Sequence, residues 1–173
     1  MNSRFAPYII SLIAFAGFII RAIYWLPLMP DKIAIHYGFN GTADNWGNKM
    51  EFIILMGGLM LFLGMLFFGL SALMTRLPDT MINLPNKEYW LAPERRETSL
   101  NTVAQLMKDI GSRTLLFFAV IFEITCRSNA SLSLQIDTQL FFIVFGMYLF
   151  AVIVSIVYFV KQFSKPEHTT LNT

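Results

Sequence analysis

The sequence predicts an all-α integral membrane protein, built as a four-span helix bundle. Of its 173 residues, 55% are hydrophobic and 14% are charged, whereas a soluble domain carries about a quarter charged residues. The mean hydropathy is also high, at +0.57. Several apolar runs reach the ~20 residues that a helix needs to cross the hydrocarbon core of a bilayer. Together these observations exclude an ordinary soluble domain.

The four apolar runs place the spans at residues 8–28, 52–74, 114–132 and 140–160. The first begins like a signal peptide, but its apolar part is too long for one and contains Arg21, so we expect an uncleaved anchor. The third gives the weakest signal, because Glu123 and Arg127 fall inside it. The predicted regions are a two-span domain (1–75), an inner loop and helix (76–113), two further spans (114–160) and a polar tail (161–173).

The orientation follows from the basic residues beside the spans, since cytoplasmic loops are enriched in Lys and Arg. Only Lys32, Lys49 and Arg127 fall on the side of the first loop. Nine basic residues fall on the other side: Arg4, Arg76, Lys87, Arg95, Arg96, Lys108, Arg113, Lys161 and Lys165. We therefore expect both termini and the 76–113 segment in the cytoplasm, with the polar loop 29–50 outside.

The inner segment is expected to end in an amphipathic surface helix. Pro93 is well placed at a helix start, and Leu100, Val103, Met107 and Ile110 then recur at intervals of three or four residues. This spacing predicts a helix lying on the inner leaflet and ending before Gly111, ahead of the third span. Docking of a cytoplasmic partner is the alternative for the same face.

Small residues recur every seven positions in the second span, at Gly57, Gly64 and Ser71. They fall on one helix face, where small side chains let membrane helices approach closely. The stripe predicts packing against a neighbouring helix, either within the chain, in a homo-oligomer or in a larger membrane complex.

Ionisable residues inside spans are costly and usually find partners within the bundle. Arg21 and Glu123 fall at similar depths in spans that run in the same direction. We therefore predict an Arg21–Glu123 ion pair, with Arg127 one turn further along and able to share the carboxylate. A structural pin between two helices is the leading interpretation, and a proton or ion relay is the alternative.

The outer loop is unusually polar for this chain and reads DKIAIHYGFNGTADNWGNK from Asp31. Alternation predicts a strand with Ile33, Ile35 and Tyr37 on one side and Ala34 and His36 on the other, followed by turns. The loop is a structural hairpin, a recognition surface or a weak metal site formed by His36 with two aspartates, and we expect no metal because no second His is near. The candidate recognition residues are Asp31, His36, Tyr37, Asp44, Trp46 and Lys49.

These residues carry a resemblance to a known family. The matching positions are Pro30-Asp31, Ile33, Ile35, His36, Tyr37, Gly41, Asp44, Trp46 and Lys49. In this pattern the first 75 residues or so resemble a bacterial membrane family of unknown function that shares the N-terminal domain of the SdpI-type toxin-immunity proteins. The chain departs from it at Ala34 and Ala43, where prolines are common, and it has fewer spans than SdpI-type proteins. The resemblance implies a small multi-pass protein of the bacterial inner membrane.

Three function classes remain open from the sequence. The first is a non-enzymatic protein for toxin or peptide immunity, or for envelope-stress sensing, whose outer loop meets a peptide or toxin. The second is an accessory or structural subunit of a larger membrane complex. The third, an enzyme or transporter built on His36 or Glu123, ranks last, so we expect no enzyme activity.

The composition also limits the cofactors and partners. The single Cys126 excludes an intrachain disulfide and a cysteine-rich metal site, so no cofactor is expected. The net charge is only +2, and the basic residues gather on the inner side, which gives no case for nucleic acid. The expected partners are the lipid bilayer, an extracellular peptide or toxin, and a membrane protein or second copy.

Overall fold

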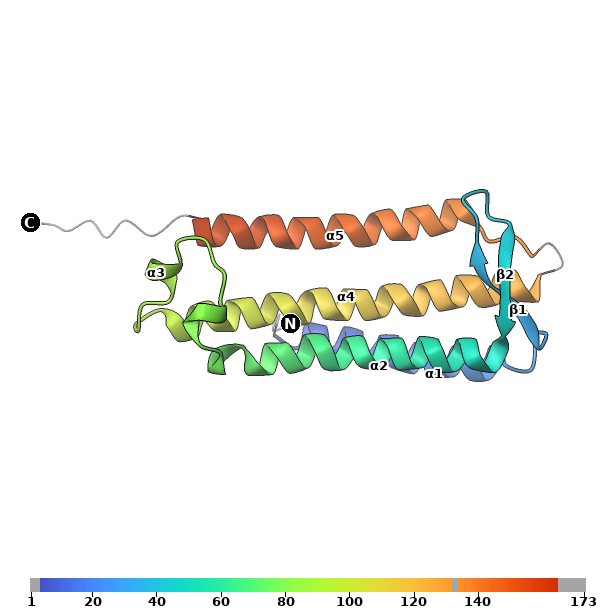
Figure 1. Cartoon of the computed structure of the whole chain (residues 1–173), viewed down its shortest axis with the longest axis horizontal. Coiled ribbons are helices and arrows are strands. Elements are labelled where there is room, and N and C mark those ends of the chain that lie inside the picture. Colours follow the sequence, from blue (N-terminus) through green and yellow to red (C-terminus); the bar gives the residue numbers. More distant parts are fainter. Residues whose placement is uncertain (1–3, 132–133, 165–173) are drawn as a thin grey trace, which may run out of the picture.

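The structure, a computed structural model, describes residues 4–131 and 134–164. Most of the polar tail and the last residue of the predicted third span therefore lie outside the described residues. Four long helices run side by side, with a two-stranded hairpin at one end and short helices at the other (Figure 1). We call these the hairpin end and the loop end. The elements are α1 (Ala6–Trp25), β1 (Lys32–Tyr37), β2 (Ala43–Asn48), α2 (Lys49–Leu73), η1 (Met74–Arg76), η2 (Asp79–Met81), α3 (Lys87–Trp90), α4 (Arg96–Ala130) and α5 (Thr138–Ser164).

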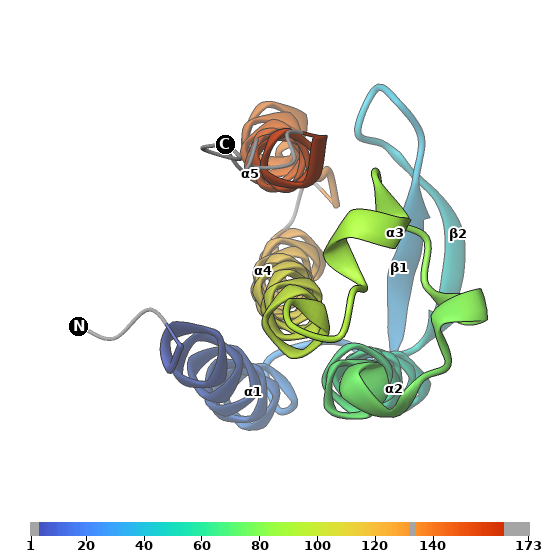
Figure 2. The same cartoon turned by 90° about the vertical axis from the view of Figure 1, so that its left-hand side faces the viewer.

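Three of the helical segments are long and apolar enough to cross a membrane: α1, α2 with its extension to Arg76, and α5. They indicate a membrane protein, as the composition predicts. Helix α4 does not meet this measure, although it lies along α1 and α2 and occupies the middle of the bundle in the end-on view (Figure 2). The four predicted spans are thus supported for three helices, and the hairpin adds a small sheet to the predicted all-α fold.

The predicted surface helix is wrong as a separate element, because α4 continues without a break from Arg96 to Ala130. Gly111 does not end a helix but lies where α2 crosses α4. A Cβ atom at Gly111 would lie 2.5 Å from the Cβ of Phe67. The glycine therefore serves close helix contact, the role that small residues have between membrane helices.

The apolar face of the first part of α4 is covered by protein. Leu100 and Ala104 are buried in a cluster with the 74–91 segment and Phe163 of α5. Trp90 of α3 extends this cluster, and its indole Nε1 donates a hydrogen bond to the Phe163 carbonyl at 2.7 Å. The segment after α2 packs against the apolar face of α4. This face therefore contacts protein, where the sequence predicts contact with lipid.

Replacing Gly111 with Ala is expected to lower the free energy of unfolding by about 1–3 kcal/mol, the usual effect of overpacking. The added methyl group meets Phe67, and this outweighs the gain of about 1 kcal/mol in helix propensity. Thermal unfolding in detergent measures the change. Gly146→Ala is the matched control, since a Cβ there has nothing within 4 Å. Equal stability of the two variants would contradict the close crossing of α2 and α4.

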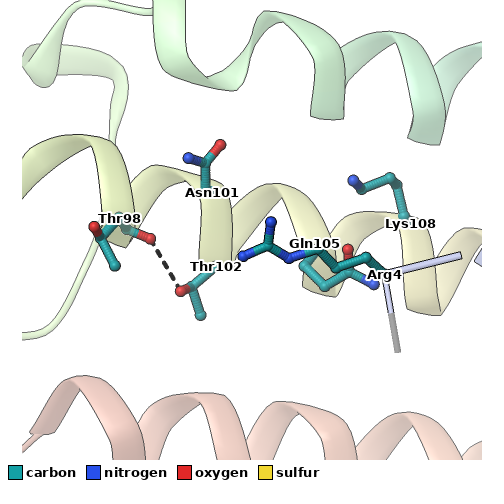
Figure 3. A pocket seen from close by; sticks show the side chains of 6 residues that line it. All are labelled: Arg4, Thr98, Asn101, Thr102, Gln105 and Lys108. Carbon is teal, nitrogen blue, oxygen red and sulfur yellow. Dashed lines mark hydrogen bonds between the residues drawn. The ribbon is translucent and has the colours of Figure 1, made fainter. Parts of the chain in front are cut away.

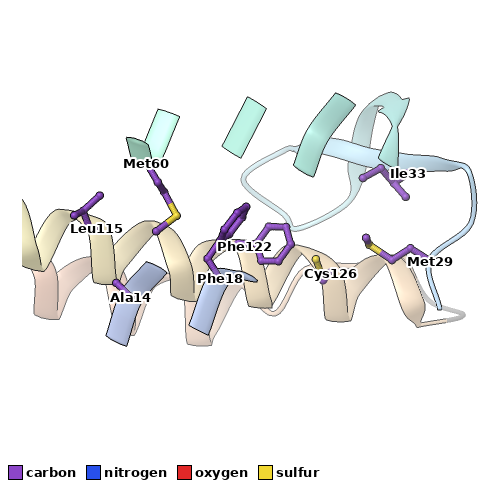
Figure 4. Packing of buried hydrophobic residues seen from close by; sticks show 8 residues of the cluster. All are labelled: Ala14, Phe18, Met29, Ile33, Met60, Leu115, Phe122 and Cys126. Carbon is purple, nitrogen blue, oxygen red and sulfur yellow. The ribbon is translucent and has the colours of Figure 1, made fainter. Parts of the chain in front are cut away.

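The central core joins α1, α2, α4 and the hairpin (Figure 4). Phe122 of α4 is fully buried, with its ring 4.7 Å from that of Phe18 and 5.6 Å from that of Phe52. The predicted small-residue stripe packs within this chain. A Cβ at Gly57 would lie 3.2 Å from the Phe18 ring, and one at Gly64 would lie 3.4 Å from that of Phe15. The third member, Ser71, is buried and donates a hydrogen bond to a carbonyl of its own helix.

The hairpin pairs β1 with β2 in antiparallel fashion, but not with the side-chain alternation that the sequence predicts. Ile33 and Ala34 are both buried, whereas Ile35 and His36 are both exposed. The register shifts between Ala34 and His36, as in a β-bulge. A bulge changes the direction of the side chains that follow it. The predicted alternation of side chains between the two faces of the strand is therefore wrong beyond Ala34.

Candidate functional site

Asn129 of α4 joins the hairpin to the bundle. Its Oδ1 accepts a hydrogen bond from the Ala34 amide at 2.6 Å, and its Nδ2 donates to the Ala34 carbonyl at 2.9 Å. The same Nδ2 lies within hydrogen-bond distance of the Tyr37 hydroxyl, at 3.1 Å. Burial raises the pKa of the Tyr37 phenol above its ordinary value. The Asn129 side chain thus bonds to the β1 backbone in the way that a neighbouring strand would.

A second attachment holds the tip of the hairpin to the segment before α5. The Ile136 amide donates to the Gly41 carbonyl at 3.0 Å, and Thr42 forms a bridge with Gln135. Gly41 has a φ of 81°, and a Cβ there would lie 2.9 Å from the Ile136 carbonyl oxygen. A side chain at this position would be strained and would clash, so glycine is required for the attachment.

A groove of about 600 Å³ lies between the docked hairpin, α4 and the start of α5. This volume is within the ~300–1,000 Å³ range of small-molecule sites. Polar groups belong to the hairpin, at His36 and Asp44, and to two threonines, Thr125 and Thr138. Its apolar and aromatic lining consists of Ile35, Tyr37, Phe39, Ile121, Ile136, Phe141 and Phe142. The groove therefore suits a ligand that carries both apolar and polar groups.

The ionisable side chains that line the groove include a His–Asp pair. His36 Nδ1 lies 2.5 Å from Asp44 Oδ1, and the side chains are 68% and 50% exposed. Exposed pairs stabilise a fold by only about 0–1 kcal/mol, so the hairpin does not depend on this one. An ionised carboxylate can only accept, which assigns the proton to Nδ1. Nε2 has no hydrogen-bond partner in the part of the chain that the structure describes, so it is open to a ligand.

Phe39 is a groove residue that the sequence analysis missed. It lies beyond β1, near the tip of the hairpin, and is 96% exposed. Packing within the chain does not explain so exposed an aromatic ring beside a groove. The available signal was its position directly before the Asn40-Gly41 turn, at the tip of the predicted hairpin.

The other predicted recognition residues lie elsewhere on the hairpin. Asp31 and Lys49 pair at its base, with Lys49 Nζ 3.1 Å from Asp31 Oδ1 and 3.0 Å from the Met29 carbonyl. Trp46 is 39% exposed and is not among the residues that line the groove. The structure therefore brings His36, Tyr37 and Asp44 together and leaves the other three outside the site. Within residues 4–131 and 134–164, no three His, Cys, Asp or Glu side chains lie close enough to hold a metal ion.

The structure also brings Arg21 and Glu123 together, between α1 and α4. Arg21 donates from Nε to Oε2 at 2.7 Å and from Nη2 to Oε1 at 2.9 Å, which is a bidentate pair. Arg127 donates to Oε1 at 2.6 Å, and Trp25 Nε1 donates to Oε2 at 2.8 Å. Each carboxylate oxygen thus accepts two hydrogen bonds, an arrangement that favours a structural pin over a relay.

The comparisons with known proteins cover only part of the chain. No curated protein and no solved structure matches it. A family described as "Domain of unknown function (DUF1648)" matches residues 12–61. This segment includes most of α1, the whole hairpin with His36 and Asp44, and the first half of α2. The chain is therefore similar to that domain from within α1, through the hairpin, to the middle of α2.

Proposed function

We propose that the protein is a non-enzymatic protein of the bacterial inner membrane that recognises a membrane-active peptide or toxin in the groove beside His36 and Asp44. In this proposal α4 is the fourth span, both termini are cytoplasmic, and the hairpin faces outward. The observation that carries it is a largely apolar groove that is also lined by His36, whose Nε2 is open to a ligand.

The chemistry of the groove supports an amphipathic ligand. Its aromatic and aliphatic walls can bury one or two apolar side chains, each worth about 1.5–3 kcal/mol when fully buried. His36 offers a hydrogen bond to a polar group of the same ligand. Phe39 adds an exposed ring where a peptide would first meet the protein. The first 75 residues resemble a membrane family of unknown function that shares the N-terminal domain of the SdpI-type toxin-immunity proteins, and immunity as the biological role is part of the proposal.

The accessory-subunit hypothesis receives less support. The small-residue stripe that suggested it is occupied within the chain, because Gly57 faces Phe18 and Gly64 faces Phe15. A Gly64→Leu variant would disturb this internal packing first, so loss of a partner from that variant would not distinguish the two functions.

The proposal is tested by challenging bacterial cells, with and without the protein, with a panel of membrane-active peptides while survival and membrane potential are recorded. We expect protection against at least one peptide. His36→Ala should raise sensitivity to that peptide about tenfold, because a lost hydrogen bond to a ligand is worth about 1.5 kcal/mol.

Lys32→Gln is the control, since Lys32 is exposed on the same strand and does not line the groove. It should protect as well as the wild type, at equal expression. Equal killing and equal depolarisation with and without the protein, across the whole panel, would contradict the proposed function.

A further inference from the structure

A second pocket lies along the first half of α4, toward the loop end of the bundle (Figure 1), and Figure 3 shows the side chains that line it. It has a volume of about 450 Å³ and lies between the chain before α1 and the first half of α4. Its lining is entirely polar or charged: Arg4, Thr98, Asn101, Thr102, Gln105 and Lys108. No such pocket is expected from the apolar composition of the chain.

The polar lining comes from one face of α4. Thr98, Asn101, Thr102, Gln105 and Lys108 are spaced by three, one, three and three residues, which keeps them on neighbouring rows of a helix. The opposite face of the same turns is buried in the cluster described above. Neither burial in protein nor contact with acyl chains suits so polar a surface, so it faces water or a polar ligand.

The two cations of the pocket lie at the end of a membrane span. Arg4 comes directly before α1, which begins at Ala6 and is apolar enough to cross a membrane. Lys108 Nζ lies 5.5 Å from the ring centroid of Tyr8, in the first turn of α1. Both charges are therefore at the level of lipid headgroups, whichever side of the membrane this end faces.

Within the described residues neither cation of the pocket forms a salt bridge, but Lys108 lies over the Tyr8 ring and interacts electrostatically with Asp109, the next residue of α4. In the described part of the chain, no carboxylate lies within salt-bridge distance of Arg4 or Lys108. The nearby Asp109 is hydrogen-bonded by Gln105 Nε2 at 3.3 Å. The Thr102 hydroxyl and the Gln105 amide already donate to the Thr98 carbonyl and to Asp109. The two cations, with the Thr98 hydroxyl and the Asn101 amide, are therefore the main donors left for a phosphate.

We propose that this pocket binds the phosphate headgroup of an anionic phospholipid. Arg4 supplies a planar fork of donors that matches phosphate oxygens, and Lys108 supplies a second positive charge in the same pocket. Exposed apolar side chains of α1, among them Ile9 and Leu12, offer a surface for the acyl chains. The bound lipid would contact both the start of α1 and the first half of α4.

The test compares lipid binding to the purified full-length protein in detergent, by native mass spectrometry with phosphatidylglycerol and phosphatidylcholine. The wild type should bind phosphatidylglycerol more tightly by about tenfold or more. Arg4→Gln/Lys108→Gln should lose about 10- to 30-fold in affinity for phosphatidylglycerol, from ~1 kcal/mol for each basic residue near an anionic surface. Its affinity for phosphatidylcholine should not change.

Arg76→Gln/Lys161→Gln is the matched control, since it removes two exposed cations from the same end of the bundle, outside the pocket. An equal loss in this control, or no preference of the wild type for the anionic lipid, would overturn the proposal. Displacement by free glycerol phosphate at concentrations similar to the lipid would also overturn it, in favour of a soluble ligand. Arg4→Gln alone, at an exposed position outside every helix, keeps the test valid if the double variant unfolds.

Discussion

Asn129→Ala is expected to release the hairpin from α4 and to lower the free energy of unfolding by about 3 kcal/mol. The Ala34 amide and carbonyl are buried, and both bond to the Asn129 side chain. Without it, two buried backbone groups lose their partner, at about 1–3 kcal/mol for each unsatisfied group. Thermal unfolding in detergent measures the stability, and limited proteolysis of the hairpin reports its release.

The matched control is Asn45→Ala, on the hairpin itself. Asn45 is exposed, and its Oδ1 accepts one local hydrogen bond, from the Trp46 amide at 2.8 Å. Its loss should change stability by less than about 1 kcal/mol and leave the hairpin resistant to protease. Equal proteolysis of the wild type and Asn129→Ala would contradict the docking of the hairpin on α4.

Glu123→Leu is expected to destabilise the bundle, because it leaves Arg21 without its carboxylate on a helix that is apolar enough to cross a membrane. The double variant Arg21→Leu/Glu123→Leu should recover most of this loss, since an ion pair within a bundle is often replaceable by apolar packing. Urea or thermal unfolding of the four members of this cycle, in one detergent, gives the coupling energy.

A structural pin and a relay differ in one further measurement. Glu123→Gln should leave proton leak unchanged in vesicles, because both oxygens of the carboxylate are occupied by hydrogen bonds in the structure. A stable Glu123→Gln variant with altered proton leak would contradict the structural role. So would a double variant that is no more stable than Glu123→Leu alone.

Much of the fold follows from local patterns. The apolar runs predict three of the long helices, and the depth of Arg21 and Glu123 within their spans predicts that the two side chains meet. The single helix α4 was not predictable in the same way. Its polar first half and Gly111 look like a surface helix and a break until Phe67 and the segment after α2 are placed against them.

The candidate site divides in a similar manner. His36, Tyr37 and Asp44 lie within eight residues of one another in the sequence, on the two strands of one hairpin. The turn residues between the strands are enough to predict that they come together. The walls of the groove come from α4 and α5, about a hundred residues away in the chain, and no local pattern places them there. Asn129 was visible as a polar residue near the end of an apolar run, but its partner Ala34 depends on the bulge in β1.

The most direct test of peptide recognition in the groove is photo-crosslinking of a peptide to the protein in living cells. A photoreactive phenylalanine replaces either Phe142, which lines the groove, or Phe150, which is 70% exposed on the same helix and lies outside it. Each peptide of the panel, carrying a fluorescent label, is added before irradiation. The protein should protect against at least one peptide of the panel. We expect that peptide to crosslink at position 142 and not at position 150. Equal crosslinking at both positions, or crosslinking at 150 alone, would contradict recognition in the groove.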